Sequence, residues 1–291
     1  MHSTPRVLFL ALVCATNLGA QITLVDDLNR SVSIPSAAQR IVSLAPSITE
    51  SLFAIGAGSR VVGVTDYCNY PLAAKSKEQV GGVINPNIEK IVSLRPDLIL
   101  LTMEGNVRED FNKLTSFGVP VFVTNPRTLQ GIRESIAKIG SLAGREEEAA
   151  RLVYSMKNVE DSVKTLTQKA VRPRVLFFVS LQPIIVVGTS TFLNELIELA
   201  GGVNIAASTG STYPTYSREV VLENNPDVLI FMSEIIQDTD EITNLYPEWS
   251  KLNAVLAGKV FTIDADVLSR PGPRAVNGLR ALFHLLHPQH Q

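Results

Sequence analysis

The chain has 291 residues, of which 45% are hydrophobic and 19% are charged, a composition typical of a globular protein rather than a disordered or fibrous one. This length suits one large domain or two lobes of ordinary size. The formal net charge of −2 includes no excess of basic residues, which argues against nucleic acid as a partner.

The first twenty residues have the pattern of a secretory signal peptide. One Arg precedes the apolar run 7–15, and the small residues of 17–20 predict cleavage after Ala20. The run is too short to cross a bilayer as a helix. A buried N-terminal strand is one alternative. A lipid attached at Cys14 is another, which the bulky Val13 in front of it disfavours. We therefore expect an exported protein in the periplasm.

Removal of the signal would leave Cys68 as the single cysteine. A lone cysteine forms no intramolecular disulfide, so the fold must depend on its hydrophobic core. We expect Cys68 to be a small buried hydrophobic residue, and contact with a ligand is the alternative.

Strands and helices alternate through the first half of the chain. Ser47 with Glu50 three residues later has the form of a capping box at a helix start. The expected strands are a pair within 22–35, then 40–46, 61–64, the end of 87–100, and 119–123, and the expected helices are 47–56, the start of 87–100, 110–117 and 129–142. This order is typical of parallel βα units.

Residues 145–170 predict one long helix between the two halves. The stretch contains neither Pro nor Gly, and its apolar residues recur at helical spacing. A helix of about 25 residues would be ~38 Å long at the usual rise per residue. Because Arg172 and Pro173 end it, we expect a rigid connection between two lobes.

The second half repeats the first. In both halves a Glu lies seven residues before a Pro-Asp pair and two residues after a cap-type residue. The first copy is Asn87, Glu89 and Pro96-Asp97, and the second is Ser217, Glu219 and Pro226-Asp227. The strands 174–183 and 259–263 and the helix 191–202 also match earlier elements, and a last helix is expected at 277–286.

Repetition over about 130 residues predicts a duplicated domain rather than a solenoid. We expect a signal peptide at 1–20, an N-terminal lobe at 21–143, a connecting helix at 144–171 and a C-terminal lobe at 172–291.

The sequence lacks the motifs of several enzyme classes. The sequence has no phosphate-binding loop, no nucleophile elbow and no His-Glu-x-x-His. After the signal, histidines occur only at 284, 287 and 290, and Pro288 breaks the helix there, so a metal site is not expected. An exported glycosidase using Glu89 and Glu219 is the alternative from the enzyme class. However, a helix start keeps a carboxylate ionised, which is wrong for a general acid.

The loops after the strand ends are where open α/β sheets bind ligands. In this chain they carry Ser47, Tyr67, Tyr70, Ile84, Asn85, Met103 and Glu104 in the first half, and Gln182, Pro183, Ile184, Tyr213, Tyr216, Glu234, Arg270 and Arg274 in the second. The set is aromatic and apolar with a few polar groups, which suits a large, mostly apolar ligand better than a bare metal ion or a phosphate. Ordinary packing is the alternative for each Tyr.

The stretches 40–50, 61–71, 87–100 and 217–219 together resemble the periplasmic substrate-binding proteins of ABC importers for cobalamin, haem and iron–siderophores. The cobalamin-binding members are the most similar, and the resemblance covers nearly all of the mature chain. It implies an α/β fold in which two similar lobes with mainly parallel sheets are joined by one long helix, with the ligand held between the lobes.

The resemblance also implies a function without catalysis or a catalytic cofactor. A monomeric binding protein would capture cobalamin (vitamin B12) or a related corrinoid and deliver it to a permease dimer, meeting the membrane only through that transporter. In the family, one Glu on each lobe docks onto arginines of the permease, and the matching positions are Glu89 and Glu219. The implied ligand contacts are Tyr67, Ile84, Ile184, Tyr213 and Arg270.

Two rival ligands remain open within the same family. Tyr213 stands where Trp is common, and the loop 81–86 lacks a Trp that some cobalamin binders carry. A haem binder would offer an axial Tyr or His, a role open to Tyr67, Tyr70 or Tyr213. A ferric siderophore would usually require several basic residues in the cleft, and only Arg270 and Arg274 are evident.

Overall fold

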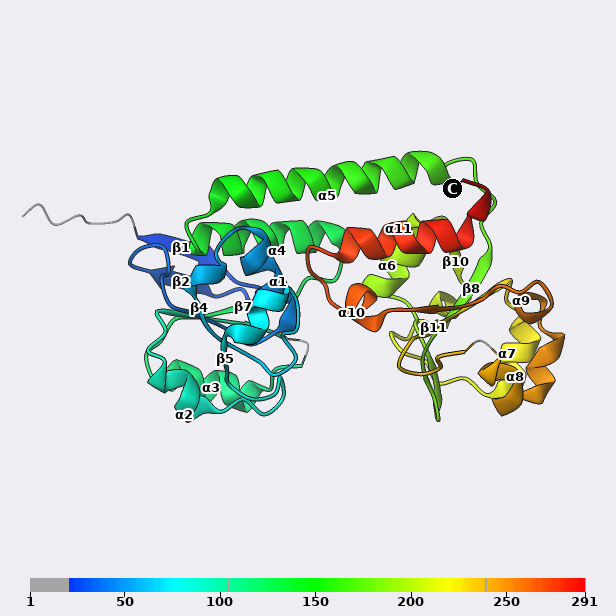
Figure 1. Ribbon diagram of the computed structural model, residues 1–291, viewed down its shortest axis with the longest axis horizontal. Helices are drawn as coiled ribbons and strands as arrows, with labels where there is room; N and C mark the ends of the chain where they lie inside the picture. The colour runs from blue at the N-terminus through cyan, green and yellow to red at the C-terminus, as the bar shows by residue number, and fades with distance from the viewer. Residues whose placement is uncertain (1–20, 104, 239, 291) are drawn as a thin grey trace, which may run out of the picture.

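The computed structural model describes residues 21–103, 105–238 and 240–290. The expected signal peptide, Cys14 and Glu104 lie outside these residues. Figure 1 shows two lobes side by side beneath a long helix, α5 (Glu146–Thr167), which spans both of them. Within the described residues, no helix is long and apolar enough to cross a membrane.

The N-terminal lobe contains a parallel sheet of five strands in the order β5-β4-β3-β6-β7 among the described residues. Its strands are β3 (Ile41–Ser43), β4 (Val61–Val64), β5 (Glu78–Gln79), β6 (Leu98–Thr102) and β7 (Val121–Thr124), preceded by the hairpin β1 (Ile22–Val25) and β2 (Ser31–Ile34). Its helices are α1 (Pro46–Ala54), α2 (Ile88–Ser93), α3 (Arg108–Ser116) and α4 (Leu129–Leu142), with short 3₁₀ turns at Gly58–Arg60 and Leu72–Ser76.

The C-terminal lobe repeats this plan with a sheet in the order β10-β8-β11-β12. The strands are β8 (Arg174–Leu181), β10 (Val203–Asn204), β11 (Val228–Met232) and β12 (Val260–Ile263), and β9 (Ile184–Val186) adds antiparallel to β8. The helices are α6 (Phe192–Leu199), α7 (Arg218–Asn224), α8 (Glu241–Leu245), α9 (Asn253–Leu256), α10 (Ala265–Leu268) and α11 (Ala275–Leu286), and 3₁₀ turns occupy Ile205–Thr209, Pro247–Lys251 and Pro288–His290. The prediction of two similar lobes with mainly parallel sheets is therefore confirmed.

The long helix joins the lobes through one shared core. It packs on α4 in the first lobe and on α11 in the second. Its buried face includes Met156 and Val163, which belong to a cluster that also holds Leu98 of β6 and Ile230 of β11. The helix has 22 residues and ends at Thr167, slightly short of the expected length. Because the core is continuous through both lobes, the helix fixes their orientation instead of linking two independent bodies.

The expected capping box at the first helix is wrong. Helix α1 begins at Pro46, and its N-cap residue Ala45 makes no side-chain cap. Proline suits the first helical position, where the backbone N–H would have no intrahelical partner. The carboxylate of Glu50 is buried and accepts hydrogen bonds from Arg270 and Arg274 of the other lobe instead.

Candidate ligand-binding cleft and acidic helix starts

A cavity of about 400 Å³ lies where the carboxyl ends of β3 and β6 meet the loop before α11. This volume falls within the usual range of ligand pockets, roughly 300–1,000 Å³. The lining residues are Ala45, Pro46, Ser47, Tyr67, Val83, Ile84, Thr102, Ser269, Arg270 and Pro271. Both lobes contribute, because residues 269–271 come from the C-terminal half of the chain. The strand-end position is the one that parallel α/β sheets use for ligands.

Two large hydrophobic side chains at this cavity are exposed to solvent. Tyr67 is 63% exposed and Ile84 is 67% exposed. They come from separate loops, one after β4 and one before α2. An exposed aromatic beside an exposed aliphatic at a cavity mouth is a surface that a flat apolar ligand could cover.

The loop that carries Ile84 is held by Asn106, which the sequence analysis did not single out. The amide nitrogen Nδ2 of Asn106 donates to the carbonyl oxygens of Val83 at 2.8 Å and Leu44 at 3.2 Å. Its Oδ1 accepts from the backbone N–H of Thr102 at 2.9 Å. One side chain therefore ties this loop to the ends of both strands that frame the cavity.

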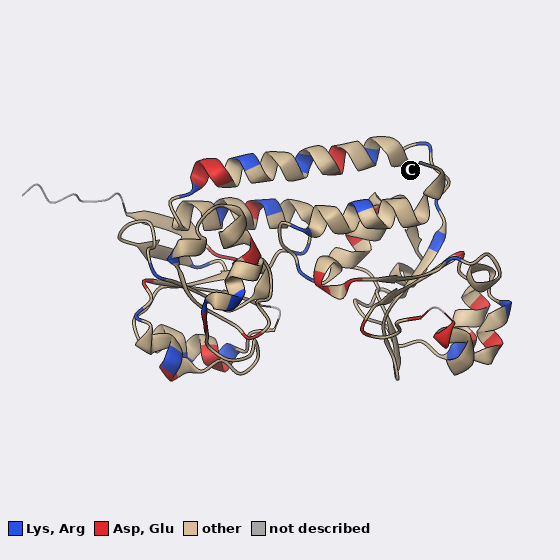
Figure 2. Ribbon diagram, in the orientation of Figure 1, with Lys and Arg blue, Asp and Glu red and all other residues tan. Residues whose placement is uncertain are grey.

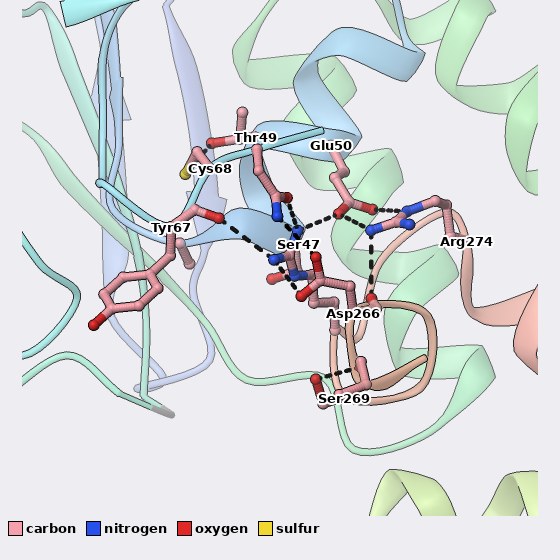
Figure 3. Close-up of polar contacts among 12 residues, drawn as sticks. Ser47, Thr49, Glu50, Tyr67, Cys68, Asp266, Ser269 and Arg274 are labelled. Atoms are coloured by element: carbon pink, nitrogen blue, oxygen red, sulfur yellow. Dashed lines mark hydrogen bonds and ion pairs between the residues drawn. The ribbon is translucent and has the colours of Figure 1, made fainter. Parts of the chain in front are cut away.

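The buried side chain of Cys68 anchors the loop that carries Tyr67. The Cys68 side chain is buried, as predicted, with Thr49 Oγ1 at 3.1 Å and Thr65 Oγ1 at 3.2 Å from its sulfur. Figure 3 shows the Tyr67 ring pointing away from Cys68 and from the polar cluster behind it. The thiol therefore supports the loop, while the aromatic ring next to it remains available.

Behind the cavity, two arginines of the C-terminal lobe meet Glu50 of α1 (Figure 3). Arg274 donates through Nε to Glu50 Oε2 at 2.8 Å and through Nη2 to Oε1 at 2.6 Å. Arg270 donates through Nη1 to Glu50 Oε1 at 3.1 Å and to Asn69 Oδ1 at 2.7 Å. Asp266 accepts from Arg270 Nη2 and from Asn69 Nδ2. This cluster joins the lobes beside the cavity, and it was missed at the sequence level.

The environment of Arg274 keeps it firmly cationic. The hydrogen bonds that Arg274 donates to the Glu50 carboxylate raise the pKa of the Arg274 guanidinium, although partial burial acts in the opposite direction. The guanidinium carbon also lies 4.3 Å from the centre of the Tyr70 ring. Tyr70, one of the candidate axial ligands, therefore packs against an arginine, and it does not line the cavity.

The structure brings three of the five expected ligand contacts together: Tyr67, Ile84 and Arg270 all line this cavity. Ile184 is buried in β9 within the core of the C-terminal lobe. Tyr213 is exposed on a segment that pairs with β9, where the Val186 N–H donates to the Pro214 carbonyl at 3.1 Å. These two residues belong to the C-terminal lobe and do not line this cavity.

A second cavity, of about 710 Å³, lies in the C-terminal lobe at the carboxyl ends of β8 and β11. Its lining includes Gln182, one of the expected loop residues, together with Ile235, Ile236 and Leu245. A cavity thus lies at the strand ends of each parallel sheet.

The repeated Glu motifs form the two helix starts that the sequence predicts. Asn87 Oδ1 accepts from the Lys90 N–H at 2.9 Å at the start of α2, and Ser217 Oγ accepts from the Val220 N–H at 3.3 Å at the start of α7. Glu89 lies in the first turn of α2 and Glu219 in the first turn of α7, and both are exposed.

These helices lie on the sides of their lobes away from α5 (Figure 1), and Figure 2 shows acidic residues in both regions. A hydrogen bond from Ser217, helped by the backbone N–H of Glu219 itself, lowers the pKa of the Glu219 carboxyl. Glu219 therefore carries a full negative charge near neutral pH.

Within the residues that the structure describes, no group of three or more His, Cys, Asp or Glu side chains is placed to hold a metal ion. His287 is buried, and its Nε2 lies 2.9 Å from the Ala200 carbonyl oxygen, so it belongs to the core.

Residues 41–267 match the periplasmic binding protein family. The chain belongs to this family. It is therefore a binding protein rather than an enzyme, as predicted. A substrate-binding lipoprotein of an ABC transporter from Bacillus subtilis, named YvrC and described as uncharacterized, is 34% identical over 92% of this chain and 86% of its own length.

Two solved structures share the fold. The periplasmic vitamin B12-binding protein BtuF of Vibrio cholerae superposes with a TM-score of 0.77 and 30% identity, over 88% of this chain and 99% of its own. The periplasmic haem-binding protein RhuT of Roseiflexus sp. RS-1 superposes with a TM-score of 0.78 and 27% identity, over 87% of this chain and 100% of its own. The fold confirms the expected two-lobed binding protein, and these two structures are named for different ligands, vitamin B12 and haem.

Proposed function

We propose that this protein captures cobalamin or a closely related corrinoid between its lobes and delivers it to the permease of an ABC transporter. The observation that carries this proposal is the cavity at the junction of the lobes, where Tyr67 and Ile84 leave apolar surface exposed beside Arg270. A corrinoid has a broad macrocycle with apolar faces and amide groups around its rim, which matches apolar contacts with a few polar groups.

The vitamin B12-binding protein of Vibrio cholerae supports the same ligand, since it shares the fold over nearly its whole length. Under this proposal Tyr67 and Ile84 contact the macrocycle from the N-terminal lobe, Tyr213 contacts the ligand from the C-terminal lobe, and Arg270 binds a polar group at the rim. Ile184 would act indirectly, as the buried residue of β9 against which the Tyr213 segment is paired.

The decisive experiment is calorimetric titration of the purified mature protein with cyanocobalamin, haemin and a ferric siderophore. We expect cyanocobalamin to bind in the micromolar range or tighter. Absence of that binding would overturn the corrinoid proposal. A Tyr67→Ala variant should weaken cyanocobalamin binding by on the order of tenfold, since one stacked aromatic contact is worth about 1 kcal/mol beyond its buried area.

Haem is the second candidate ligand, because Tyr67 is an exposed phenol at the cavity and phenolate is a known axial ligand of haem iron. If haemin binds through Tyr67, the Tyr67→Phe variant should lose the charge-transfer absorption of a phenolate–iron bond while keeping the apolar contact. Unchanged absorption in that variant would exclude Tyr67 as the axial ligand.

We further propose that Glu89 and Glu219 dock the protein onto basic residues of the two permease subunits. Both carboxylates are exposed at helix starts, one on each lobe. Charged groups so placed orient a complex and raise its association rate. The double variant Glu89→Ala/Glu219→Ala should keep its ligand affinity and lose transport in reconstituted vesicles.

A matched control is Glu147→Ala/Glu223→Ala, which removes two exposed carboxylates from α5 and from the later part of α7. This control should transport normally. Loss of ligand binding in the Glu89/Glu219 variant would show that the ligand site has been misplaced.

The shared core beneath α5 implies that the lobes move little when the ligand binds. Comparison of ligand-free and ligand-bound crystal structures tests this. A large closure of the lobes would contradict the proposal.

We also propose that the exported protein begins after Ala20. The Bacillus subtilis relative is a lipoprotein, which makes a lipid at Cys14 the competing form. The intact mass of protein purified from its native envelope distinguishes a chain that starts at Gln21 from one with a lipid-modified cysteine.

A further inference from the structure

The junction between the lobes holds a balanced set of charges next to the cavity. Arg270 and Arg274 approach from the C-terminal lobe, where Asp266 also lies, and Glu50 approaches from α1 of the N-terminal lobe. The Glu50 side chain is only 2% exposed, whereas the Asp266 side chain is 35% exposed. Two guanidinium groups and two carboxylates thus leave this cluster with no net charge.

Arg270 is the one charged residue among those that line the cavity in the described part of the chain. Its Nη1 donates to Glu50 and Asn69, and its Nη2 donates to Asp266 and, at 3.4 Å, to the Tyr67 carbonyl oxygen. Both terminal nitrogens are therefore engaged by protein acceptors, two of which are carboxylates. A ligand carboxylate beside Arg270 would therefore approach a guanidinium whose charge is already balanced by two protein carboxylates.

We propose that Glu50 and Asp266 set the charge of the ligand that this cleft accepts. By neutralising Arg270 and Arg274, they favour a ligand whose edge toward Arg270 carries uncharged amides, and they disfavour a ligand with carboxylates there. This proposal rests on the proposed function, because it concerns the ligand edge that faces the same cavity. Glu50 and Asp266 need not touch the ligand. They act as specificity-determining residues through Arg270.

The discrimination has two physical causes. Arg270 attracts a ligand carboxylate less because its charge is balanced, and Glu50 and Asp266 repel that carboxylate. A ligand carboxylate near Arg270 also comes close to Glu50 and Asp266, and like charges in a partly buried site repel strongly because water screens them poorly. An amide suffers no such repulsion, and its oxygen can still accept a hydrogen bond from a guanidinium. Binding sites often discriminate through a repulsive group of this kind.

The test compares two ligands that differ in one group: cyanocobalamin, and its monocarboxylic acid made by hydrolysis of one side-chain amide. The ratio of their dissociation constants is measured for the wild type, Glu50→Gln and Asp266→Asn. We expect the wild type to prefer the amide ligand. Glu50→Gln should shift the ratio toward the carboxylate ligand by on the order of tenfold, the effect expected for one poorly screened charge close to the ligand.

Asp266→Asn should shift the ratio in the same direction by a smaller factor, because Asp266 is the more exposed of the two carboxylates. Both shifts should shrink as salt is added. A ratio that is the same in the wild type and in both variants would overturn the proposal. Because each ratio is measured within one variant, a general loss of affinity or stability cancels.

The double variant Glu50→Gln/Arg274→Gln removes one charge of each sign and restores a neutral cluster. It should return the ratio toward the wild-type value, whereas a purely structural role of Glu50 would leave the ratio as in the single variant. If Glu50→Gln does not fold, Asp266→Asn still decides the question, since it leaves the pairing of Glu50 with Arg274 in place.

Failure of this inference is distinguishable from failure of the proposed function. If the wild type does not bind cyanocobalamin, the corrinoid proposal fails. Haemin and its dimethyl ester then supply the matched pair, because the ester replaces the two propionate carboxylates with uncharged methyl ester groups. A shift toward haemin in Glu50→Gln would support charge selection at Arg270, and an unchanged ratio would overturn it.

Discussion

The two lobes repeat the same support for their acidic helices. In the N-terminal lobe the carboxylate of Asp97 accepts from the backbone N–H groups of Gln39 at 2.8 Å and Arg40 at 2.9 Å. In the C-terminal lobe the carboxylate of Asp227 accepts from the Arg174 N–H at 2.8 Å. The Pro-Asp pair of the repeat therefore joins the segment after each helix to the start of a neighbouring strand.

The arginine at each strand start completes the unit. The Arg40 guanidinium donates to the Leu94 carbonyl at the end of α2, and the Arg174 guanidinium donates to the Asn225 carbonyl at the end of α7. The repeated motif thus spans a helix and the start of a neighbouring strand, and this explains why the Pro-Asp pair and a distant Arg recur together in both halves.

The lobes differ in the core beneath these helices. The cluster under α2 is mainly aliphatic and includes the fully buried Ile91. The cluster under α7 is aromatic: Phe178 and Phe231 stack with ring centres 4.5 Å apart, and Trp249 lies 5.6 Å from Phe178. The repeated helix-and-strand unit can therefore pack on either an aliphatic or an aromatic core.

Aromatic residues of this second cluster also contact the start of α7 directly. Trp249 Nε1 donates to the Arg218 carbonyl at 3.4 Å, and the Arg218 guanidinium carbon lies 4.6 Å from the centre of the Tyr246 ring. Arg218 immediately precedes Glu219. The difference between the lobes teaches that the helix start that carries Glu219 is held by tertiary contacts of Arg218 as well as by the Ser217 cap.

The largest expected loss of stability comes from truncating one fully buried side chain in each of these two clusters. Trp249 and Ile91 are both fully buried. Trp249→Ala should lower the free energy of unfolding by about 4 kcal/mol and Ile91→Ala by about 3 kcal/mol, since the tryptophan leaves the larger cavity. Urea unfolding of both variants measures this, with Trp249→Phe as the control that retains an aromatic ring. An equal or smaller loss for Trp249→Ala would contradict an aromatic core that dominates the second lobe.

A smaller effect should follow from removing the two Pro-Asp carboxylates. Asp97 accepts two backbone hydrogen bonds and Asp227 accepts one. Asp97→Ala should therefore cost about 2 kcal/mol of unfolding free energy and Asp227→Ala about 1 kcal/mol, at the low end for charge-assisted bonds because both sites are partly solvated. Denaturant unfolding of the matched pair gives the values. The reverse order would show that the two repeat units are not supported in the same way.

The local sequence pattern was sufficient for much of the fold. Helix α4 has the bounds 129–142 that its pattern predicts, because its apolar residues keep a helical period and Thr128 caps it. The short strand β9 was not predicted, because three residues carry too little periodicity to separate a strand from a loop.

The site shows where local patterns stop being informative. Ser47 and Glu50 fit a capping box, yet the partners of Glu50 lie 220 and 224 residues further along the chain. No short window can record such a contact. Asn106 was missed for the same reason, since its bonds to Leu44 and Val83 depend on the packing of two strands and a loop. The position of the loops after the strand ends placed Tyr67, Ile84 and Arg270 in a larger set of candidates, and the resemblance to a family singled them out as ligand contacts.

Removal of the helix caps should have an effect no larger than that of Asp227→Ala, and it gives the sharpest comparison of the two helix starts. Asn87→Ala and Ser217→Ala should each cost about 1 kcal/mol of stability, because each removes one helix cap. Ser217→Ala should also raise the pKa of the Glu219 carboxyl, since the Ser217 hydrogen bond is the main cause of its lowered pKa.

The sign of the pH dependence follows from that lowered value. A carboxyl whose pKa is lower in the folded state contributes stability above its unfolded pKa, and this contribution disappears as the pH falls through the folded pKa. The wild type should thus lose the Glu219 contribution only in acid, and Ser217→Ala should lack the part of it that the Ser217 hydrogen bond supplies. Carbon-detected NMR titration of the Glu219 carboxyl measures the shift. An unchanged titration in Ser217→Ala would mean that the helix start alone, through its backbone N–H groups, lowers the pKa of Glu219.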